Sequence, residues 1–185
     1  MATLRFGAAV LSAIMAAAPA VQAQKADAVT FGVSGGLTLP VGRIGDTQGT
    51  GFNLQGHATY KPSSVPFGLR GDVGYWSTPG KSITAITGGP SVKYSSVNWF
   101  TVNGNVIYHF EGAKDATFVP YVIGGAGLYS ANRNLGTKFG VNAGGGVTFR
   151  LAGIDAFTEA RLHNVFTDGS SSRLIPISFG VNIKR

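Results

Sequence analysis

The sequence predicts an all-β fold, an eight-stranded antiparallel up-and-down β-barrel that crosses a lipid bilayer and is preceded by a cleaved signal peptide. Three observations lead to this prediction. Apolar and polar residues alternate through eight successive segments, which is the pattern of strands with two unlike faces. Several apolar faces carry an aromatic residue near each end, as strands do when they meet two membrane–water interfaces. No helical periodicity separates the segments, so the strands follow one another in series.

The N-terminal residues have the composition of an export signal. Arg5 precedes an Ala-rich apolar stretch, 6–18, which is too short for a confident membrane-spanning helix. Small residues for cleavage follow at Val21-Gln22-Ala23. We therefore predict a signal peptide over residues 1–23 and a single barrel domain over residues 24–185, which leaves the cytoplasm.

The composition restricts the classes of site and partner. The chain has 185 residues, no cysteine, 28 glycines and only 12% charged residues. The lack of cysteine excludes disulfides and thiolate metal ligands. The glycines lie inside the alternating segments, where we expect close packing in a crowded interior. The formal net charge of +7 suits anionic lipid headgroups rather than nucleic acid, to which an exported chain has little access.

The first three strands are predicted at 29–41, 51–61 and 67–76, because each alternates apolar with small or polar residues. The first two are separated by a Gly-rich polar loop at 42–50. The second and third are separated by a short turn at 62–66, whose two prolines interrupt strand pairing.

The region from Ser77 to Val97 is long for a connection between neighbouring strands. It contains two short strand-like segments, 82–87 and 91–95, split by Gly88-Gly89-Pro90. We expect a hairpin that extends beyond the barrel rim and offers a sheet edge to a surface partner.

The next three strands are predicted at 98–110, 117–130 and 138–151. Both faces of the middle one are apolar, so its orientation stays open: either Tyr121 and Tyr129 or Val122 and Leu128 face the lipid. A charged turn at 111–116 and a polar loop at 131–136 connect the three strands.

The last two strands are predicted at 154–166 and 174–183, after a tight turn at 152–153 and around a Ser-rich loop at 167–173. With both chain ends in the periplasm, the short turns near residues 62, 111 and 152 are periplasmic. The connections near 42, 77, 131 and 167 are then external, and they are on the whole longer, as expected of membrane barrels.

A soluble lipocalin-like carrier has the same strand count but the opposite orientation, with apolar faces inside and polar faces outside. Two observations favour the membrane orientation. Aromatics on one apolar face are separated by about 20 Å of barrel height at ~3.3 Å per residue and a tilt of about 45°, which is close to the apolar band of a membrane barrel. The opposite faces lack the charge density of a solvated surface. We predict an interface girdle made of Phe52, Tyr60, Phe67, Tyr75, Phe100, Phe110, Phe139 and Phe149.

The stretch 120–129, PYVIGGAGLY, is similar to the Pro-Tyr…Gly-x-Gly strand of small eight-stranded outer-membrane barrels of the OmpA, OmpX and opacity-protein type. The segment 139–151, which leads into 156–162, resembles their penultimate hairpin. In layout the resemblance covers the whole mature chain. It implies a location in the outer membrane, in contact with outer-membrane lipid.

Four charged residues fall on polar faces and are predicted to lie in the lumen: Arg70, Asp72, Glu159 and Arg161. Side chains fill the interior of a barrel of this size, and buried charges must be paired. We expect a structural network that plugs the lumen; the alternative is an ion gate in a narrow pore.

The three histidines, His57, His109 and His163, also fall on polar faces but at different heights, so we predict no metal site. A lipid-modifying enzyme is the main functional alternative. His163, Asp168 and the run from Ser170 to Ser172 supply the residue types of a base, an orienting acid and a nucleophile. Turns contain the same residue types, so we predict no enzymatic activity and no cofactor.

We predict an exported, monomeric outer-membrane barrel with a plugged polar lumen and a structural or adhesion-like surface role. Basic residues of the external loops are candidates for contact with lipopolysaccharide phosphates. They are Arg43, Lys81, Lys93, Arg133 and Arg173.

Overall fold

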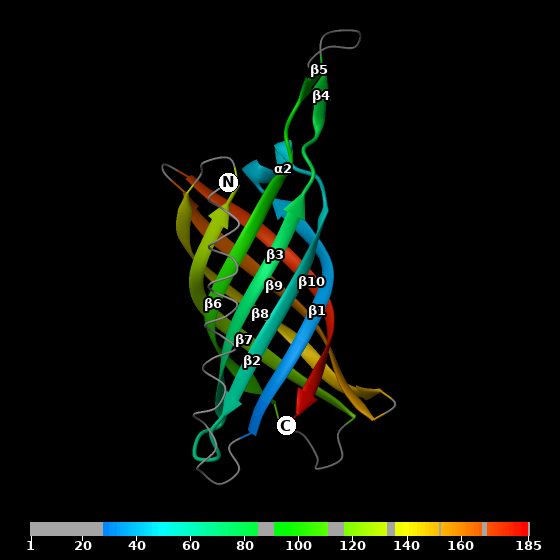
Figure 1. Cartoon of the computed structure of the whole chain (residues 1–185), viewed down its shortest axis with the longest axis vertical. Helices are drawn as coiled ribbons and strands as arrows, with labels where there is room; N and C mark the ends of the chain where they lie inside the picture. The colour runs from blue at the N-terminus through cyan, green and yellow to red at the C-terminus, as the bar shows by residue number, and fades with distance from the viewer. Residues whose placement is uncertain are drawn as a thin grey trace, which may run out of the picture.

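A computed structural model describes residues 28–84, 91–110, 117–132, 136–151, 153–167 and 170–184. Eight of its strands form one closed antiparallel barrel in the order β1-β10-β9-β8-β7-β6-β3-β2 (Figure 1). The predicted fold class is therefore confirmed. No helix among the described residues is long and apolar enough to cross a membrane. The predicted signal peptide, 1–23, lies outside the described residues.

The strands alternate in direction and are joined in chain order. The barrel strands are β1 (Ala28–Val41), β2 (Gly51–Lys61), β3 (Phe67–Thr78), β6 (Val97–His109), β7 (Phe118–Ala131), β8 (Thr137–Leu151), β9 (Ile154–Thr167) and β10 (Ser170–Lys184). Pairing of β1 with β10 closes the barrel, for example Gly35 opposite Phe179. We call the end at which β1 begins and β10 ends the terminal end, and the opposite end the hairpin end (Figure 1).

Most predicted boundaries agree with these strands to within two residues, but one connection differs. The prediction of a Ser-rich loop at 167–173 is wrong, because β9 continues to Thr167 and β10 already begins at Ser170. Ser171 pairs with Phe166 and Ser172 pairs with Val165. Backbone pairing thus continues past the point where the apolar alternation fades.

The alternating pattern is explained by what each face meets. Apolar side chains such as Leu54, Leu69 and Val106 point outward and are exposed, whereas their polar neighbours are buried in the lumen. A bilayer would cover this exposed apolar surface. The ambiguous strand, β7, places Tyr121 and Tyr129 inside and Leu128 outside.

The hairpin end carries two further elements. A short helix, α2 (Arg43–Thr47), lies in the predicted loop 42–50, and the strands β4 (Ser82–Thr84) and β5 (Ser91–Lys93) form a separate two-stranded sheet. This hairpin rises beyond the barrel rim along the barrel axis (Figure 1). Two backbone hydrogen bonds join the end of α2 and the residues after it to the base of this hairpin. Gly49 N donates to Pro79 O at 2.7 Å, and Lys81 N donates to Thr47 O at 2.8 Å.

Candidate functional site in the barrel lumen

Three layers follow one another along the lumen. An aromatic layer lies at the hairpin end, a network of four charges lies in the middle, and a pocket opens at the terminal end. The layers arise because each strand sends alternate side chains inward. Among the described residues, the outward-facing positions of the same strands carry no comparable polar cluster, so the lumen is the candidate site.

The central layer joins β3 to β9 across the barrel. Arg70 and Asp72 come from β3, and Glu159 and Arg161 come from β9; all four are at most 4% exposed. Arg70 Nη1 lies 2.9 Å from Glu159 Oε2, and Arg70 Nε lies 2.8 Å from Asp72 Oδ1. Arg161 Nε lies 2.9 Å from Glu159 Oε1, and its Nη1 lies 3.3 Å from Asp72 Oδ2. Each guanidinium thus touches both carboxylates, and the four charges sum to zero.

Neutral side chains form further hydrogen bonds with the charged groups of this network. The Tyr121 hydroxyl donates to Glu159 Oε2 at 2.8 Å, and Arg161 Nη2 donates to Gln55 Oε1 at 2.9 Å. The Asn105 amide donates to Asp72 Oδ2. Such secondary hydrogen bonds are needed for a buried ion pair to offset the cost of removing its charges from water.

Glycine on β8 makes room for two of these side chains. A Cβ at Gly144 would collide with the backbone and side chain of Arg161, and a Cβ at Gly146 would collide with the Tyr121 ring. The middle of the Gly144-Gly145-Gly146 run faces the other way, out of the barrel. The glycine-rich stretch is therefore a packing feature of the lumen, since only a residue without a side chain fits at such close approach.

The aromatic layer closes the hairpin end. It consists of Trp76, Val97, Trp99, Tyr129, Val165 and Leu174, all buried, and Ile44 of α2 packs against it. The rings of Trp76 and Tyr129 lie 6.0 Å apart. The imidazole of His163 packs edge-on against Trp76 at 4.7 Å, and its Nδ1 lies 2.7 Å from the Tyr129 hydroxyl. Within the described residues, this layer is therefore packed across the hairpin end of the lumen.

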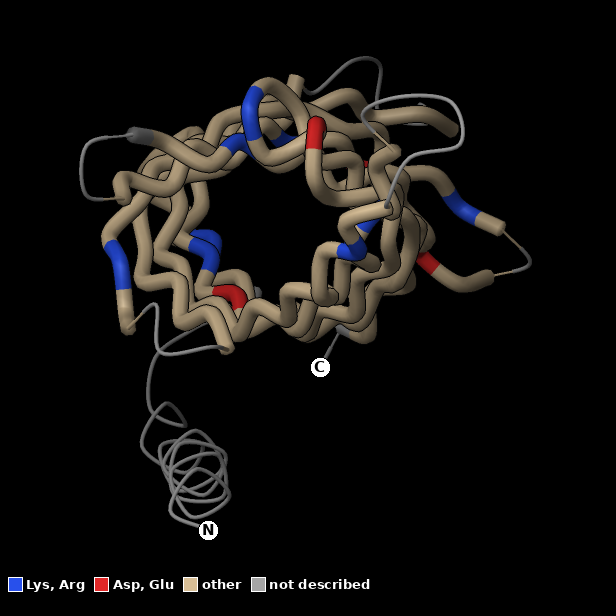
Figure 2. The backbone as a smooth tube through the Cα atoms, turned by 90° about the horizontal axis from the view of Figure 1, so that it is seen from above, with Lys and Arg blue, Asp and Glu red and all other residues tan. Residues whose placement is uncertain are grey.

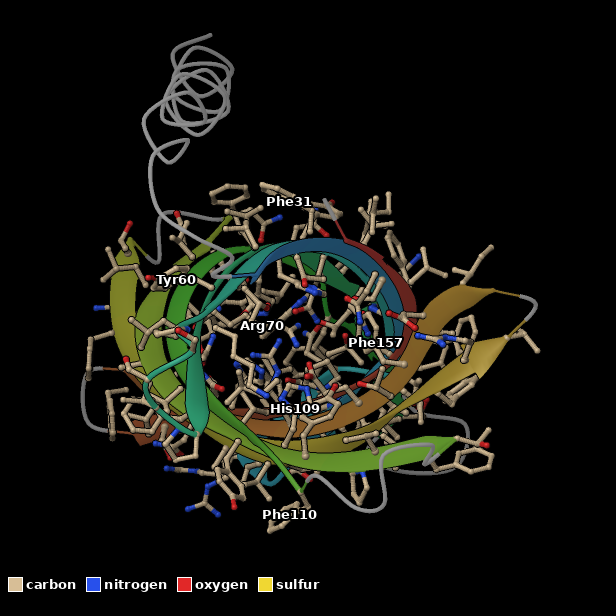
Figure 3. All side chains as sticks on the ribbon, turned by 90° about the horizontal axis from the view of Figure 1, so that it is seen from below. Phe31, Tyr60, Arg70, His109, Phe110 and Phe157 are labelled. Carbon is tan, nitrogen blue, oxygen red and sulfur yellow. The ribbon has the colours of Figure 1, made fainter. Side chains whose placement is uncertain are left out.

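The terminal end is hollow. A pocket of about 400 Å³, which we call the terminal pocket, is lined by residues that include His57, Arg70, Ile107, Tyr121 and Phe157. Seen from this end, Arg70, His109 and Phe157 point into the barrel, whereas Phe31, Tyr60 and Phe110 lie on its outer surface (Figure 3). The Arg70 guanidinium lies 5.7 Å from the centre of the Phe157 ring, and both residues line the pocket.

The three histidines lie in separate parts of the lumen. His57 and His109 line the terminal pocket, and His163 is fully buried in the aromatic layer. Within the described ranges, no group of three His, Cys, Asp or Glu side chains could hold a metal ion. Of the residues considered for an enzyme, Asp168 lies outside the described residues, and Ser171 and Ser172 belong to β10 rather than to a loop.

The predicted girdle residues lie on the outer surface. Seven of them are exposed, namely Phe52, Tyr60, Phe67, Tyr75, Phe100, Phe110 and Phe139. Phe149 is partly covered and lies 6.1 Å from the Phe118 ring. Phe118 of β7 is 65% exposed and was missed as a girdle residue, although its position at the start of an alternating strand is the same signal.

The basic loop residues are scattered. Arg43 and Lys93 are exposed, and Lys81 donates from Nζ to the carbonyl of Gly45 at 2.5 Å. Arg173 is a correction, because it lies in β10, opposite Val41, and not in a loop. Arg133 lies outside the described residues. Figure 2 shows Lys and Arg on several sides of the barrel rather than in one patch.

Sequence reasoning placed the lumen charges but assigned no role to the large aromatics beside them. Trp76, Trp99 and Phe157 occupy inward positions in strands whose outward positions are apolar. An aromatic that is out of phase with the apolar face is the signal that identifies them.

Comparisons with known proteins give one family match. The family model of the outer membrane protein beta-barrel domain matches residues 6–169. No curated protein sequence matches the chain significantly.

Solved structures show the same fold at low sequence identity. Neisserial surface protein A is 17% identical with a TM-score of 0.62, and the match covers 85% of this chain and 97% of that chain. The outer membrane protein OprG from Pseudomonas aeruginosa is 12% identical with a TM-score of 0.58, covering 85% and 97%. The outer membrane enzyme PagL is 13% identical with a TM-score of 0.51, covering 84% and 98%. At these identities the likeness concerns the fold alone.

Proposed function

The chain belongs to the outer membrane protein beta-barrel domain family, and from this premise we propose that it is a closed membrane anchor that presents the β4–β5 hairpin for contact with other surfaces. The barrel itself is an integral outer-membrane structure. The hairpin end then faces outward, because the chain ends and short turns of such barrels lie in the periplasm.

This proposal rests on the β4–β5 hairpin, because its base is fixed by hydrogen bonds and its strands are exposed. Gln48 forms an isolated β-bridge with Gly80, and the Gln48 side chain donates to Ser95 O at 3.3 Å. Beyond this base, Ile83 pairs with Val92, and both are exposed, Val92 at 59%. The two-stranded sheet has no further strand on either side in the described structure. An apolar pair on a sheet with free edges is suited to strand addition by a partner.

The experiment compares adhesion of outer-membrane vesicles to epithelial cells. Vesicles would carry the wild type, the Ile83→Asp/Val92→Asp variant or no copy of the protein. We expect the wild type to raise adhesion over empty vesicles and the double variant to return it to the empty level. A Leu69→Ala variant, which alters only the lipid-facing surface, should adhere like the wild type. Equal adhesion of wild-type and empty vesicles would contradict the surface role.

Lipid contact is the second part of the proposal. The outward apolar faces suit hydrocarbon, and exposed Arg43 and Lys93 at the hairpin end suit lipopolysaccharide phosphates. We also propose a monomer, because closure by β1 and β10 leaves no free edge in the barrel wall. Crosslinking in membranes should give only the monomer band.

Lipid modification is the alternative function, and the outer membrane enzyme PagL shows that a barrel of similar fold can be an enzyme. The position of His163 does not favour it, because this side chain is fully buried among Trp76 and Tyr129, where a lipid ester cannot reach. We propose that His163 packs the aromatic layer. Lipid extracts from cells with wild-type protein and with His163→Ala should be identical by mass spectrometry; a modified lipid A or phospholipid present only with the wild type would favour the enzyme.

A further inference from the structure

The β4–β5 hairpin has two unlike faces, which restrict the kind of partner that it can bind. Ile83 and Val92 lie directly opposite one another. Tyr94 N donates to Lys81 O at 2.9 Å, so the pairing of the two strands continues toward the base. Because side chains alternate along a strand, Tyr94 shares the face of Val92, whereas Lys93 lies on the other face. The apolar residues of the first face are exposed, Val92 at 59% and Tyr94 at 38%.

The two edges of this hairpin are not equivalent. On the β4 side, the connection after α2 already pairs with the base of the hairpin. Gln48 forms a β-bridge with Gly80, and Lys81 N donates to Thr47 O at 2.8 Å. On the β5 side, no further strand pairs with the hairpin in the described structure. The β5 edge is therefore the one that is open to an added strand.

The charge of the hairpin selects among the strands that could pair with this edge. The stretch from Ser77 to Val97 contains two lysines and no acidic residue. Lys81 Nζ donates to Gly45 O at 2.5 Å, whereas Lys93 belongs to β5 and is exposed. An opposite charge directly across from Lys93 would stabilise a strand pair, and a like charge would destabilise it. Lysine on an edge strand also disfavours pairing with an identical edge, which agrees with the monomer proposed above.

We propose that the β5 edge binds an extended acidic segment of another protein, which pairs with it as an added strand; this proposal rests on the surface role proposed for the hairpin. In the bound segment, a glutamate or aspartate lies opposite Lys93. The β-branched residues on either side of it lie on the face of Val92 and Tyr94. Backbone hydrogen bonds supply the pairing, and the alternation of acidic with apolar residues supplies the selectivity.

The probe is a fluorophore-labelled peptide, STVEVTS, whose glutamate is flanked by valines. STVKVTS reverses only the charge, and STPEPTS keeps the charge but replaces both valines by proline, which has no N–H group for strand pairing. Fluorescence anisotropy would measure the binding of each peptide to the wild-type barrel in nanodiscs of zwitterionic phospholipid, with empty nanodiscs as the blank. We expect STVEVTS to bind about five-fold more tightly than either control, or better. No binding of STVEVTS, or equal binding of either control, would overturn the proposal.

A charge reversal in the protein locates the contact. Lys93→Glu should reverse the preference, so that STVKVTS binds more tightly than STVEVTS, because the charge pair is restored with opposite signs. Arg43→Glu is the matched control, since Arg43 is also exposed at the hairpin end but belongs to α2. This variant should keep the wild-type preference. An unchanged preference in Lys93→Glu, or the same reversal in Arg43→Glu, would overturn the proposal.

These measurements use purified protein and no cells, so the surface role and the acidic partner can fail separately. Vesicle adhesion that depends on Ile83 and Val92, together with a lack of peptide selectivity, would leave the surface role intact and overturn the acidic partner. Peptide selectivity without vesicle adhesion would contradict the surface role alone.

Discussion

At the scale of single residues, the central network shows how a membrane barrel can hold charge in its interior. Two arginines and two carboxylates are each in contact with both opposite partners. Replacing all four charged residues should change the stability of the barrel little, but the loss of one of them leaves an uncompensated buried charge. This asymmetry makes the network testable by substitution.

We expect Glu159→Gln to destabilise the barrel by about 3–5 kcal/mol, because both arginines then share the single carboxylate of Asp72. The Glu159→Gln/Arg161→Gln variant removes one charge of each sign and should be less destabilised than the single variant. Urea unfolding in phospholipid vesicles, followed by the fluorescence of buried Trp76 and Trp99, gives the free energies.

The control is an ion pair near the barrel surface. Arg150 Nε lies 3.3 Å from Asp155 Oδ1, and the Arg150 side chain is 69% exposed. Arg150→Ala should cost less than about 1 kcal/mol. A Glu159→Gln barrel as stable as the Arg150→Ala barrel would show that the network contributes no electrostatic stabilisation.

Part of this site was accessible from the sequence. Strand parity places Arg70 and Glu159 on the polar face, because the alternation is local. Their direct contact is not local, since the two residues are 89 positions apart and meet only when the barrel closes. Parity also places Trp76 and Phe157 on the inward faces, but it does not show which side chains of other strands they contact, so they were assigned no role.

At the scale of elements, the predicted strands were correct where the membrane enforces the pattern. β2 and β3 alternate strictly between lipid and lumen, and their starting residues agree with the sequence prediction. The start of β10 was missed because the run from Ser170 to Ser172 contains no apolar residue, although these serines pair with the last residues of β9. The helix α2 has five residues and no buried side chain, which leaves too little periodicity to predict it.

Gly80 is expected to hold the base of the hairpin, because a Cβ at this position would collide with the carbonyl of Tyr94. Gly80→Ala should loosen the hairpin and speed trypsin cleavage after Lys81 or Lys93 several-fold, without unfolding the barrel. Gly71→Ala is the control, because a Cβ there meets open space on the outer face. Mass spectrometry of timed digests would measure both, and equal cleavage rates would contradict the brace.

The outward face of β6 supplies a test of membrane depth. Val106 lies between the exposed aromatics Phe100 and Phe110 and is itself exposed. We expect Val106→Arg to cost about 2–4 kcal/mol, because a charge near the middle of the bilayer is poorly solvated. Ser96→Arg, beyond Phe100 and outside the band, should cost about 0–1 kcal/mol. Unfolding titrations in vesicles measure the cost of each substitution. Equal costs would contradict the assignment of Val106 to the lipid-facing surface.

At the scale of the whole molecule, two separate layers of side chains lie one above the other in the lumen. The charge network fills the middle and the aromatic layer fills the hairpin end. We therefore expect no steady conductance from the wild type in planar bilayers, and none from Glu159→Gln/Arg161→Gln, because the aromatic layer remains. Stepwise conductance of the wild type would instead support the narrow pore.

The ion pairs that join β3 to β9 have a consequence for how the barrel forms and persists. Strands so distant along the chain approach one another only late, so these contacts are absent from early assembly intermediates. Interactions that form after the rate-limiting step mainly slow the reverse reaction. The Arg70–Glu159 contact should therefore slow the unfolding of the inserted protein and extend its lifetime in the membrane. This effect is kinetic stability rather than equilibrium stability.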